Sequence, residues 1–313
     1  MRQIIIFLLM FFTALILHNT AKAQPNLNVS ANLAVLHQQH SGYHFTTLPF
    51  TSADGQRHYR VYIAIPDQKA PANGFPVFYA LDGNAVLDFL TPANMQTLAT
   101  QAQPPVLVLL GYATAKRFDV QARAYDYTIA PADDNTDPLD SSRINGGADL
   151  FLDLIQNQIM PAVQQIVPVN INAQTLWGHS YGGLMVLHTL CTRPDLFQHY
   201  IAADPSVWLH GDLLQQEVAA VLKRKNTLSA RSLWLLNSRH KVDKIPKNPQ
   251  VAARISIRNE LIARQDSLRK KLVDELQQHA DLAIRQDYFP NENHGSMFGK
   301  SLQLALFDPI NRQ

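Results

Sequence analysis

The chain has 313 residues, with 27 basic and 25 acidic side chains, a hydrophobic fraction of 46% and a single cysteine. Its first 23 residues contain Arg2 and Lys22 and no acid, so the remainder carries 27 − 2 = 25 basic and 25 acidic groups and no formal net charge. This balance gives no reason to expect a nucleic-acid or membrane partner. One cysteine, Cys191, excludes an intramolecular disulfide and a thiolate cage around a metal ion.

The amino-terminal segment has the three parts of a secretory signal peptide. A basic residue, Arg2, precedes an apolar run from Ile4 to Leu17, and small residues lead to a cleavage site after Ala23. The apolar run is shorter than the roughly 20 residues needed to span a bilayer. We therefore expect residues 1–23 to be removed, a polar leader over 24–42, and a periplasmic protein with no stable membrane insertion.

The next segments predict strands of two kinds. YHFTTLPF (43–50) and RHYRVYIAIP (57–66) alternate apolar and polar residues around a glycine-containing turn, which predicts an antiparallel hairpin. FPVFYALDG (75–83) and PVLVLLGY (105–112) are continuously apolar, as strands buried on both faces are. Helical spacing over 85–101 lies between these two strands.

Helices and strands alternate along the rest of the chain. The predicted elements are a helix at 148–165, the strand AQTLWGHS (173–180), a helix at 182–191, the strands HYIAADPS (199–206) and SLWLLNS (232–238), a long amphipathic helix at 251–279, the strand LAIRQDYFP (282–290) and a short last helix. This order predicts an α/β protein over residues 43–313: a mainly parallel central sheet with an amino-terminal antiparallel hairpin and helices on both faces. The polar, Pro- and Gly-rich segment 113–147 is predicted to be a lid-like loop.

The pentapeptide from Gly178 to Gly182 matches the G-x-S-x-G nucleophile elbow, with Ser180 at its centre. In such an elbow a sharp turn between a strand and a helix exposes the serine hydroxyl, and side chains larger than glycine would collide. The same residues could form a glycine-rich turn without chemistry. A predicted strand before them and a predicted helix after them favour the nucleophile.

A serine nucleophile needs a base within hydrogen-bond reach. In an α/β hydrolase this histidine follows the last strand, and His294, in NENHGSMF, is the histidine at that place. The other histidines considered fall in core elements or on the surface: His188, His199, His279 and the H-x-x-H pair His37 and His40, which lacks a third metal ligand. We expect no metal site and no cofactor.

The oxyanion formed in acyl transfer requires two donors. One should be the backbone N–H of Tyr181, the residue after the nucleophile. The other should come from LDGN after the strand that begins at residue 75, and we expect the N–H of Asn84, with Gly83 as the alternative. The same tetrapeptide could also be an ordinary turn.

The acid that orients the histidine is less clearly marked. Its usual place is after the strand SLWLLNS, where Asp243 is the nearest carboxylate. Asp204, after the preceding strand, and Glu292, two residues before His294, are rivals. A dyad of serine and histidine oriented by a neutral group would also be active, because loss of the acid lowers the rate without abolishing it.

Several segments together resemble the esterase D-like group of α/β hydrolases. They are RVYIAIP, FPVFYALDGNAVLD, VLVLLGY, ARAYDYTIAP, GGADLFLDLIQNQIMPAV, WGHSYGGLMVLHTL, ADPSVWL and NENHGSMF, in this order from about residue 43 to residue 300. Within that group the chain is most similar to the periplasmic trilactone hydrolases of catecholate siderophores and to ferri-bacillibactin esterases. The resemblance implies a small-molecule ester substrate, such as the serine trilactone of enterobactin or its glucosylated form, and an acyl-serine on Ser180.

The resemblance also implies contacts with anionic catecholates. Basic residues in or beside the segment 113–147 could make these contacts or could be solvated surface: Lys116, Arg117, Arg123 and Arg143. Trp208, an aromatic residue after the strand 199–206, is a further candidate. The periplasmic relatives are described as Ser-His dyads, and RHKVDK (239–244) departs from the Gly and Glu that many relatives carry there. Two other functions stay open: a general carboxylesterase on short acyl, feruloyl or acylated-sugar esters, and an inactive hydrolase fold used for binding.

Overall fold

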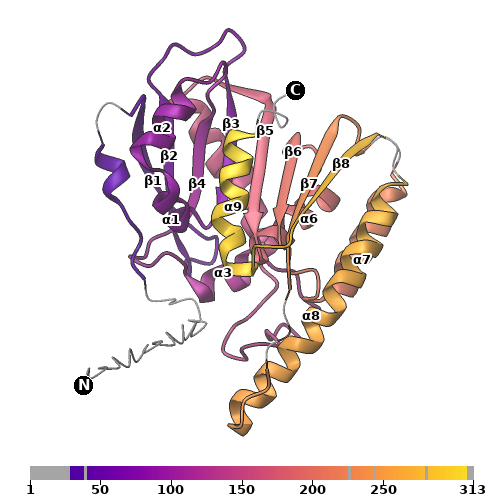
Figure 1. Ribbon diagram of the computed structural model, residues 1–313. Coiled ribbons are helices and arrows are strands. Elements are labelled where there is room, and N and C mark those ends of the chain that lie inside the picture. Colours follow the sequence, from indigo (N-terminus) through magenta and orange to yellow (C-terminus); the bar gives the residue numbers. More distant parts are fainter. Residues whose placement is uncertain are drawn as a thin grey trace, which may run out of the picture.

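The computed structural model describes residues 29–38, 41–224, 227–240, 242, 244–278 and 281–308 (Figure 1). Several features considered above lie outside these residues: the expected signal peptide over 1–23, His40, Asp243 and His279. No helix within the described ranges is long and apolar enough to cross a membrane.

One eight-stranded sheet forms the centre of the molecule, in the order β1-β2-β4-β3-β5-β6-β7-β8. The strands are β1 (Tyr43–Thr51), β2 (His58–Pro66), β3 (Phe75–Leu81), β4 (Val106–Tyr112), β5 (Val169–His179), β6 (His199–Ala203), β7 (Arg231–Ser238) and β8 (Leu282–Phe289). β1 pairs antiparallel with β2 and β2 with β4, and all the other pairs are parallel. The predicted hairpin and mainly parallel sheet are confirmed, and the all-apolar β4 is fully buried, as a central strand must be.

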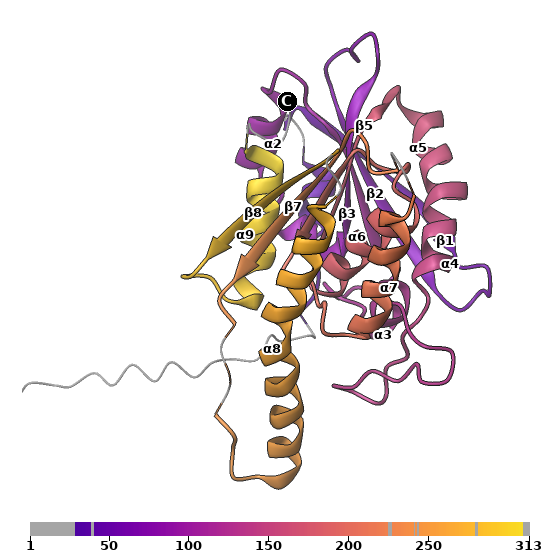
Figure 2. The same ribbon diagram turned by 90° about the vertical axis from the view of Figure 1, so that its right-hand side faces the viewer.

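Helices cover both faces of the sheet and enclose two apolar cores (Figure 2). The helices on one face are α1 (Gly83–Val86), α2 (Pro92–Ala99) and α9 (His294–Phe307). Those on the other are α3 (Val120–Asp126), α4 (Ala148–Leu154), α5 (Met160–Ile166), α6 (Tyr181–Thr192), α7 (Gly211–Leu222) and the carboxyl-terminal part of α8 (Pro249–Leu276). The short turns η1 (Ala34–His37), η2 (Leu87–Phe89) and the π-helical η3 (Ile155–Ile159) complete the elements. This layering is the predicted α/β-hydrolase architecture.

The helices differ from the expectation at several places. The pattern over 85–101 is divided among α1, η2 and α2. α7 had no counterpart among the predicted elements, and the last helix runs for 14 residues rather than being short. Pro161, near the start of α5, adjoins the π-helical turn η3, because a proline cannot donate the hydrogen bond that a regular α-helix requires there.

The segment 113–147 is not simply a polar loop over the site. It contains α3, and its Asp126 is 1% exposed. That carboxylate accepts hydrogen bonds from Tyr59 Oη at 3.0 Å and Tyr112 Oη at 3.1 Å and forms an ion pair with Arg57 at 2.9 Å. The polar composition of the segment predicted an exposed loop. Several of its polar groups are instead buried, with partners from β2 and β4.

Candidate active site

Ser180 lies in a sharp turn between β5 and α6. Its backbone has φ 63° and ψ −117°, a conformation that a residue other than glycine adopts only under strain. The Ser180 N–H donates to the carbonyl of Ala203 at 3.0 Å, and the Ser206 N–H donates to the carbonyl of Ser180 at 3.1 Å. The turn is therefore held by β6 and the loop that follows it.

The glycines of the turn are needed for close approach of the backbone. A Cβ on Gly178 would lie 2.3 Å from the carbonyl oxygen of Gly182, and a Cβ on Gly183 would lie 2.9 Å from that of Ala203. Gly182 has more room, with Leu81 Cδ1 nearest at 3.3 Å. Glycine is therefore required for steric reasons at Gly178 and at Gly183, which lies one residue beyond the G-x-S-x-G pattern.

His294 is the first residue of α9, and its Nε2 atom lies 3.0 Å from Ser180 Oγ. The start of α9 is fixed by a capping box. Asn293 accepts hydrogen bonds from the N–H groups of Gly295 and Ser296, while Ser296 Oγ accepts from the Asn293 N–H at 3.0 Å. The two side chains predicted to be nucleophile and base are thus within hydrogen-bond distance.

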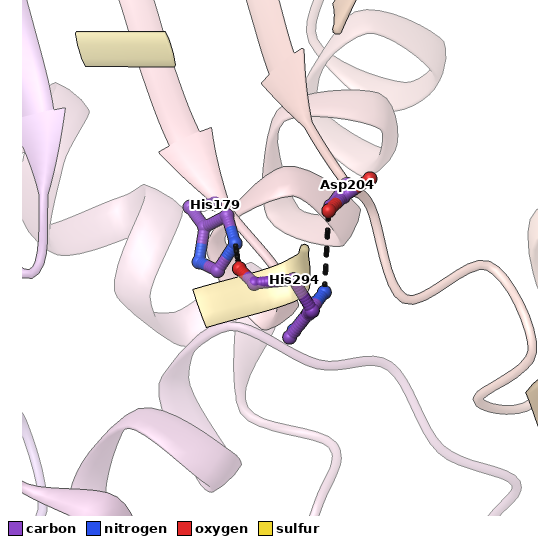
Figure 3. A group of neighbouring side chains, drawn as sticks. All are labelled: His179, Asp204 and His294. Atoms are coloured by element: carbon purple, nitrogen blue, oxygen red, sulfur yellow. Dashed lines mark hydrogen bonds and ion pairs between the residues drawn. The ribbon is translucent and has the colours of Figure 1, made fainter. Parts of the chain in front are cut away.

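The carboxylate next to His294 belongs to Asp204, whose Oδ2 atom lies 3.5 Å from His294 Nδ1 (Figure 3). Asp243, the expected acid, lies outside the described residues, and Glu292 forms no ion pair with His294 among those described. Asp204 directly follows β6, which is hydrogen-bonded to β5, whereas Asp243 follows β7, one strand farther from the elbow. The sequence carried no signal for this adjacency, because the position of β6 beside β5 is seen only in the folded sheet.

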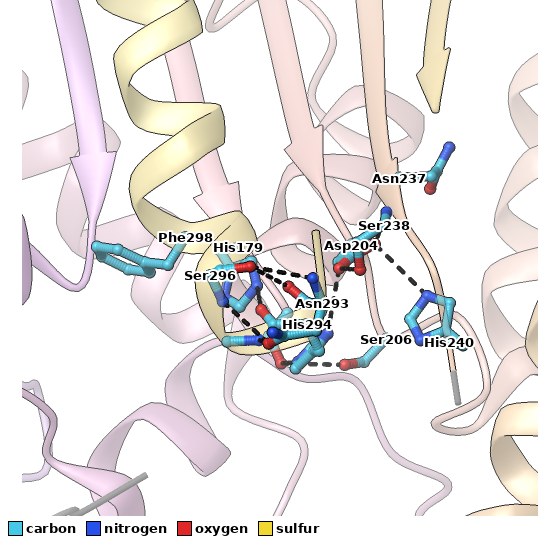
Figure 4. A network of polar contacts seen from close by, with 12 residues as sticks. His179, Asp204, Ser206, Asn237, Ser238, His240, Asn293, His294, Ser296 and Phe298 are labelled. Atoms are coloured by element: carbon cyan, nitrogen blue, oxygen red, sulfur yellow. Dashed lines mark hydrogen bonds and ion pairs between the residues drawn. The ribbon is translucent and has the colours of Figure 1, made fainter. Parts of the chain in front are cut away.

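Asp204 is completely buried and shared among several donors (Figure 4). Ser238 donates through its backbone N–H at 2.7 Å and through its hydroxyl, His240 Nε2 lies 3.5 Å away and Arg269 Nη1 lies 3.7 Å away. Burial alone would raise the pKa of Asp204, but the contacts from His240, His294 and Ser238 outweigh it and hold that pKa well below its usual range. Asp204 is therefore an anion across the working pH range of an enzyme.

His179 also belongs to the site, although no sequence pattern gave it a role. Its Nε2 atom lies 2.8 Å from the backbone carbonyl oxygen of His294, and the centroids of the two rings are 4.7 Å apart. Burial, and secondly the neighbouring His294, lower the pKa of His179 to about 3. At neutral pH the His179 imidazole is therefore uncharged, and the contact requires its Nε2–H to donate to the His294 carbonyl.

The expected oxyanion donors lie at the ends of neighbouring strands. Tyr181 begins α6, so its N–H has no acceptor within the helix. β3 pairs with β5, which brings Gly83 and Asn84, at the start of α1, beside the elbow. The side chain of Asn84 is engaged elsewhere: it donates to the carbonyls of Tyr112, Thr114 and Lys116, each at 3.1 Å. Only the backbone N–H groups of this turn are left to face a substrate.

The two arginines expected to meet the substrate are paired within the protein. Arg117 forms an ion pair with Asp88 at 2.5 Å. Arg123 is 13% exposed and donates to both carboxylate oxygens of Asp82, at 2.8 Å and 2.9 Å. Burial opposes the charge of Arg123, but the Asp82 carboxylate raises the pKa of the guanidinium above its ordinary value. Arg123 therefore supports the turn before Gly83, and its contact with a substrate stays a prediction.

The other predicted contacts have different surroundings. Arg143 pairs with Asp140 at 3.4 Å, and Lys116 is exposed. Trp208 is half-buried, its ring centroid is 6.2 Å from that of Tyr181, and it lines a cleft beside α8. Among the candidates, Trp208 therefore keeps a position suited to substrate contact.

His179, Asp204 and His294 also form a cluster of possible metal ligands, with ligand atoms within 4.8 Å of one another. The atoms are already engaged. His179 Nε2 is bonded to the His294 carbonyl, His294 Nε2 faces Ser180, and Asp204 accepts from Ser238. The donor set fits a hydrogen-bonded proton relay better than a metal site.

Comparison with known proteins places this geometry among ester hydrolases. The family model "Putative esterase" matches residues 52–296. An apo-salmochelin esterase of Escherichia coli O6:H1 is 37% identical over 268 residues, 85% of this chain and 79% of that protein. The ferri-bacillibactin esterase BesA of Bacillus subtilis is 35% identical over 164 residues, 50% of this chain and 56% of that protein. The structure of the enterobactin hydrolase IroE in complex with DFP is 33% identical, covers 90% of this chain and 100% of its own, and has a TM-score of 0.70.

Proposed function

This chain belongs to the esterase family, and we propose that it hydrolyses a siderophore trilactone, such as enterobactin or its glucosylated form, through an acyl-serine on Ser180. The observation that carries the proposal is the 3.0 Å contact between Ser180 Oγ and His294 Nε2 in a strained turn. Relatives that cover most of the chain act on salmochelin and enterobactin, which supports the choice of substrate.

In the first half-reaction His294 Nε2 removes the proton from Ser180 Oγ as the oxygen attacks the ester carbonyl. The resulting oxyanion is stabilised by the N–H of Tyr181 and by an N–H of the turn that contains Gly83 and Asn84. When the ester C–O bond breaks, His294 returns the proton to the departing serine hydroxyl of the substrate. The acyl group is then bonded to Ser180.

In the second half-reaction His294 activates a water molecule, which attacks the acyl-serine and releases a carboxylic acid and free Ser180. Asp204 stabilises the imidazolium that forms in each half-reaction and fixes the orientation of the ring. The long 3.5 Å separation between Asp204 and His294 is compatible with this role, because such contacts shorten when substrate binds.

The test is product analysis with metal-free and iron-loaded enterobactin. Purified protein should convert the cyclic trilactone to linear trimer and smaller fragments, and Ser180→Ala should abolish the conversion while the protein remains folded. A wild-type enzyme that cleaves p-nitrophenyl esters but leaves the trilactone intact would be a general carboxylesterase. A protein that cleaves neither, and is not labelled by a fluorophosphonate at Ser180, would be a binding module.

We also propose that the protein is exported to the periplasm after cleavage following Ala23. The arrangement of a basic residue, an apolar run and small residues over 1–23 supports this. Amino-terminal sequencing of protein from the periplasmic fraction should begin at Gln24. An intact Met1 in that fraction, or accumulation in the cytoplasm, would contradict the proposal.

A further inference from the structure

Residues 82–84, the oxyanion turn, are expected to supply the second oxyanion donor, and their backbone is under constraint. Asp82 has φ 54°, in the left-handed region. A Cβ on Gly83 would lie 2.6 Å from the carbonyl carbon of Leu109, so the turn is pressed against β4. Backbone N–H groups stabilise an oxyanion only where they are held in place before the reaction. The contacts that fix the oxyanion turn therefore bear on the rate.

The side chain of Asn84 ties the oxyanion turn to the end of β4 and to the loop that follows it. This side chain is buried, with only 2% of the residue exposed. Its Oδ1 atom accepts from the Tyr112 N–H at 3.0 Å, and the hydrogens of its Nδ2 atom are shared among the carbonyls of Tyr112, Thr114 and Lys116. A Cβ on Gly111 would collide with Oδ1, so β4 leaves space for the amide. Both ends of one amide thus hold the turn against residues 112–116.

Residues 29–32, the leader segment, bind to the same loop. The Ala31 N–H donates to the Ala115 carbonyl at 2.8 Å. Ser30 and Lys116 form an antiparallel bridge beside this hydrogen bond. The loop after β4 is therefore bonded both to the oxyanion turn and to the leader segment.

The leader segment also binds to the chain beyond the oxyanion turn. The Asn32 N–H donates to Asp88 Oδ1 at 2.9 Å, and Asp88 belongs to η2, which directly follows α1. Val35, three residues farther on, is 3% exposed and packs in the apolar core on that face of the sheet. The oxyanion turn, the loop after β4, the leader segment and η2 therefore form a closed ring of contacts.

We propose that Asn84 is a positioning residue for the oxyanion donors and that the leader segment completes the brace. The Asn84 amide holds the turn to the loop after β4, and the leader segment holds that loop to η2. This inference rests on the proposed function and deepens it. It gives residues 29–32, which precede the first strand of the sheet, an influence on the rate of ester hydrolysis.

The main test is Asn84→Ala. Without the amide the turn can shift against β4, and a displacement of about 1 Å can lower a rate about 100-fold. The variant should therefore lower kcat for p-nitrophenyl butyrate about 100-fold and change KM by less than about twofold. It should also weaken inhibition by butylboronic acid about tenfold or more, because the tetrahedral adduct with Ser180 Oγ places an oxygen where the oxyanion forms.

Gln174→Ala is the matched control. Gln174 is 6% exposed, and its Nε2 atom also donates to backbone carbonyls, those of Leu196 at 3.2 Å and Ile171 at 3.4 Å. It lies about 20 Å along β5 from Ser180. The control should lower the melting temperature by about as much as Asn84→Ala, and it should leave kcat and the boronic acid inhibition unchanged.

The leader segment is tested at partly exposed positions, where substitutions cost less stability than at the buried Asn84. Ala31→Pro removes the N–H that bonds to Ala115, and Asp88→Ala removes the acceptor of the Asn32 N–H. Each should lower kcat about threefold with little change in KM. Asp88→Asn retains an oxygen acceptor and should recover most of the lost activity.

A lower melting temperature without a loss of kcat in Asn84→Ala would overturn the proposal. A loss of kcat with unchanged boronic acid inhibition would also overturn it, since the oxyanion donors would then be in place. Wild-type kcat in both Ala31→Pro and Asp88→Ala would overturn the part assigned to the leader segment. Failure of the wild type to cleave p-nitrophenyl butyrate or enterobactin would overturn the proposed function instead.

Discussion

Two buried aspartates lie in similar positions on either side of β5, the strand that leads to Ser180. Asp82 follows β3 and Asp204 follows β6, and these strands are the two hydrogen-bonded neighbours of β5. Both aspartates have left-handed backbone conformations, with φ 54° and φ 40°, and are only 2% and 0% exposed. Each places a carboxylate in the interior close to Ser180, where an unpaired charge would be costly.

The partners of the two carboxylates differ. Asp82 is held by the single guanidinium of Arg123 through two short hydrogen bonds. Asp204 is shared between Ser238 and three more distant cationic or imidazole groups, at 3.5 Å to 3.7 Å. The charge of Asp82 is balanced by one close arginine, and this pair fixes the turn. The partners of Asp204 are more distant, so its negative charge can act on His294.

The largest expected effect is on Asp204. Asp204→Asn keeps the shape of the side chain but removes the charge that stabilises the His294 imidazolium, so kcat should fall by about 10³-fold or more with a smaller change in KM. Steady-state kinetics on p-nitrophenyl butyrate measures both. A larger loss of kcat in Asp243→Asn than in Asp204→Asn would refute the assignment of the acid.

The next effect is on stability at Asp82. Arg123→Met leaves a buried carboxylate without its partner and should lower the free energy of unfolding by about 3 kcal/mol, measured by urea denaturation. Arg117→Met is the matched control, since Arg117 is 28% exposed and its pair with Asp88 should contribute about 1 kcal/mol or less. Similar losses in the two variants would show that Asp82 is not held as described.

The pH dependence of stability reports on His179. The unfolded chain binds a proton at this imidazole below its ordinary pKa of 6.5, whereas the folded protein does so only near 3. Protonation of His179 in the unfolded chain therefore lowers the free energy of unfolding as the pH falls from 6.5 towards 3. The decrease is about 2 kcal/mol between pH 6.5 and 4.5.

Asp126 has the opposite effect on stability in this pH range, because burial raises its pKa to about 7. The measurement is therefore the difference in the free energy of unfolding between the wild type and His179→Gln. The two stability curves should converge as the pH falls below 6.5. Parallel curves would contradict a neutral, buried His179.

His179 should also affect catalysis through the position of His294. His179→Phe removes the hydrogen bond to the His294 carbonyl and should lower kcat about tenfold, while KM changes little. His179→Gln retains an N–H donor and should recover most of the lost activity. If Phe and Gln are equally impaired, the ring contact and not the hydrogen bond positions His294.

The smallest effect is expected at Arg269. Because Asp204 has several partners, Arg269→Gln should lower kcat only about threefold, in contrast to the large effect of removing the single partner of Asp82. The measurement is kcat for p-nitrophenyl butyrate beside the free energy of unfolding. A loss of kcat as large as that of Asp204→Asn would show that the charge on Asp204 is not shared as inferred.

The parts of the site that the sequence predicted were those marked by local pattern. Ser180 lies in a pentapeptide between a strand and a helix, and His294 follows the last strand, so order along the chain was sufficient to select both. The sheet was predictable for the same reason, since continuous apolar runs such as β4 differ visibly from the alternating β1 and β2.

The parts that could not be predicted depend on contacts between distant segments. Asp204 is suited to be the acid because β6 lies beside β5, which sequence order does not state. Arg117 and Arg123 looked available because their partners, Asp88 and Asp82, lie in another segment. His179 acquires a role only when α9 places the His294 carbonyl beside it.

Ser180, the proposed nucleophile, and Asp204, the proposed acid, adjoin one β–α–β unit, β5, α6 and β6, whereas His294, the proposed base, belongs to the last helix of the fold. Asp204 and Ser180 can reach their relative positions through contacts that are local in the chain, but His294 arrives only when α9 docks. We therefore expect catalytic competence to be acquired at a late stage of folding. A nascent or truncated chain that lacks α9 would hold the strained Ser180 without a base. The rate at which activity returns during refolding would therefore report when α9 docks.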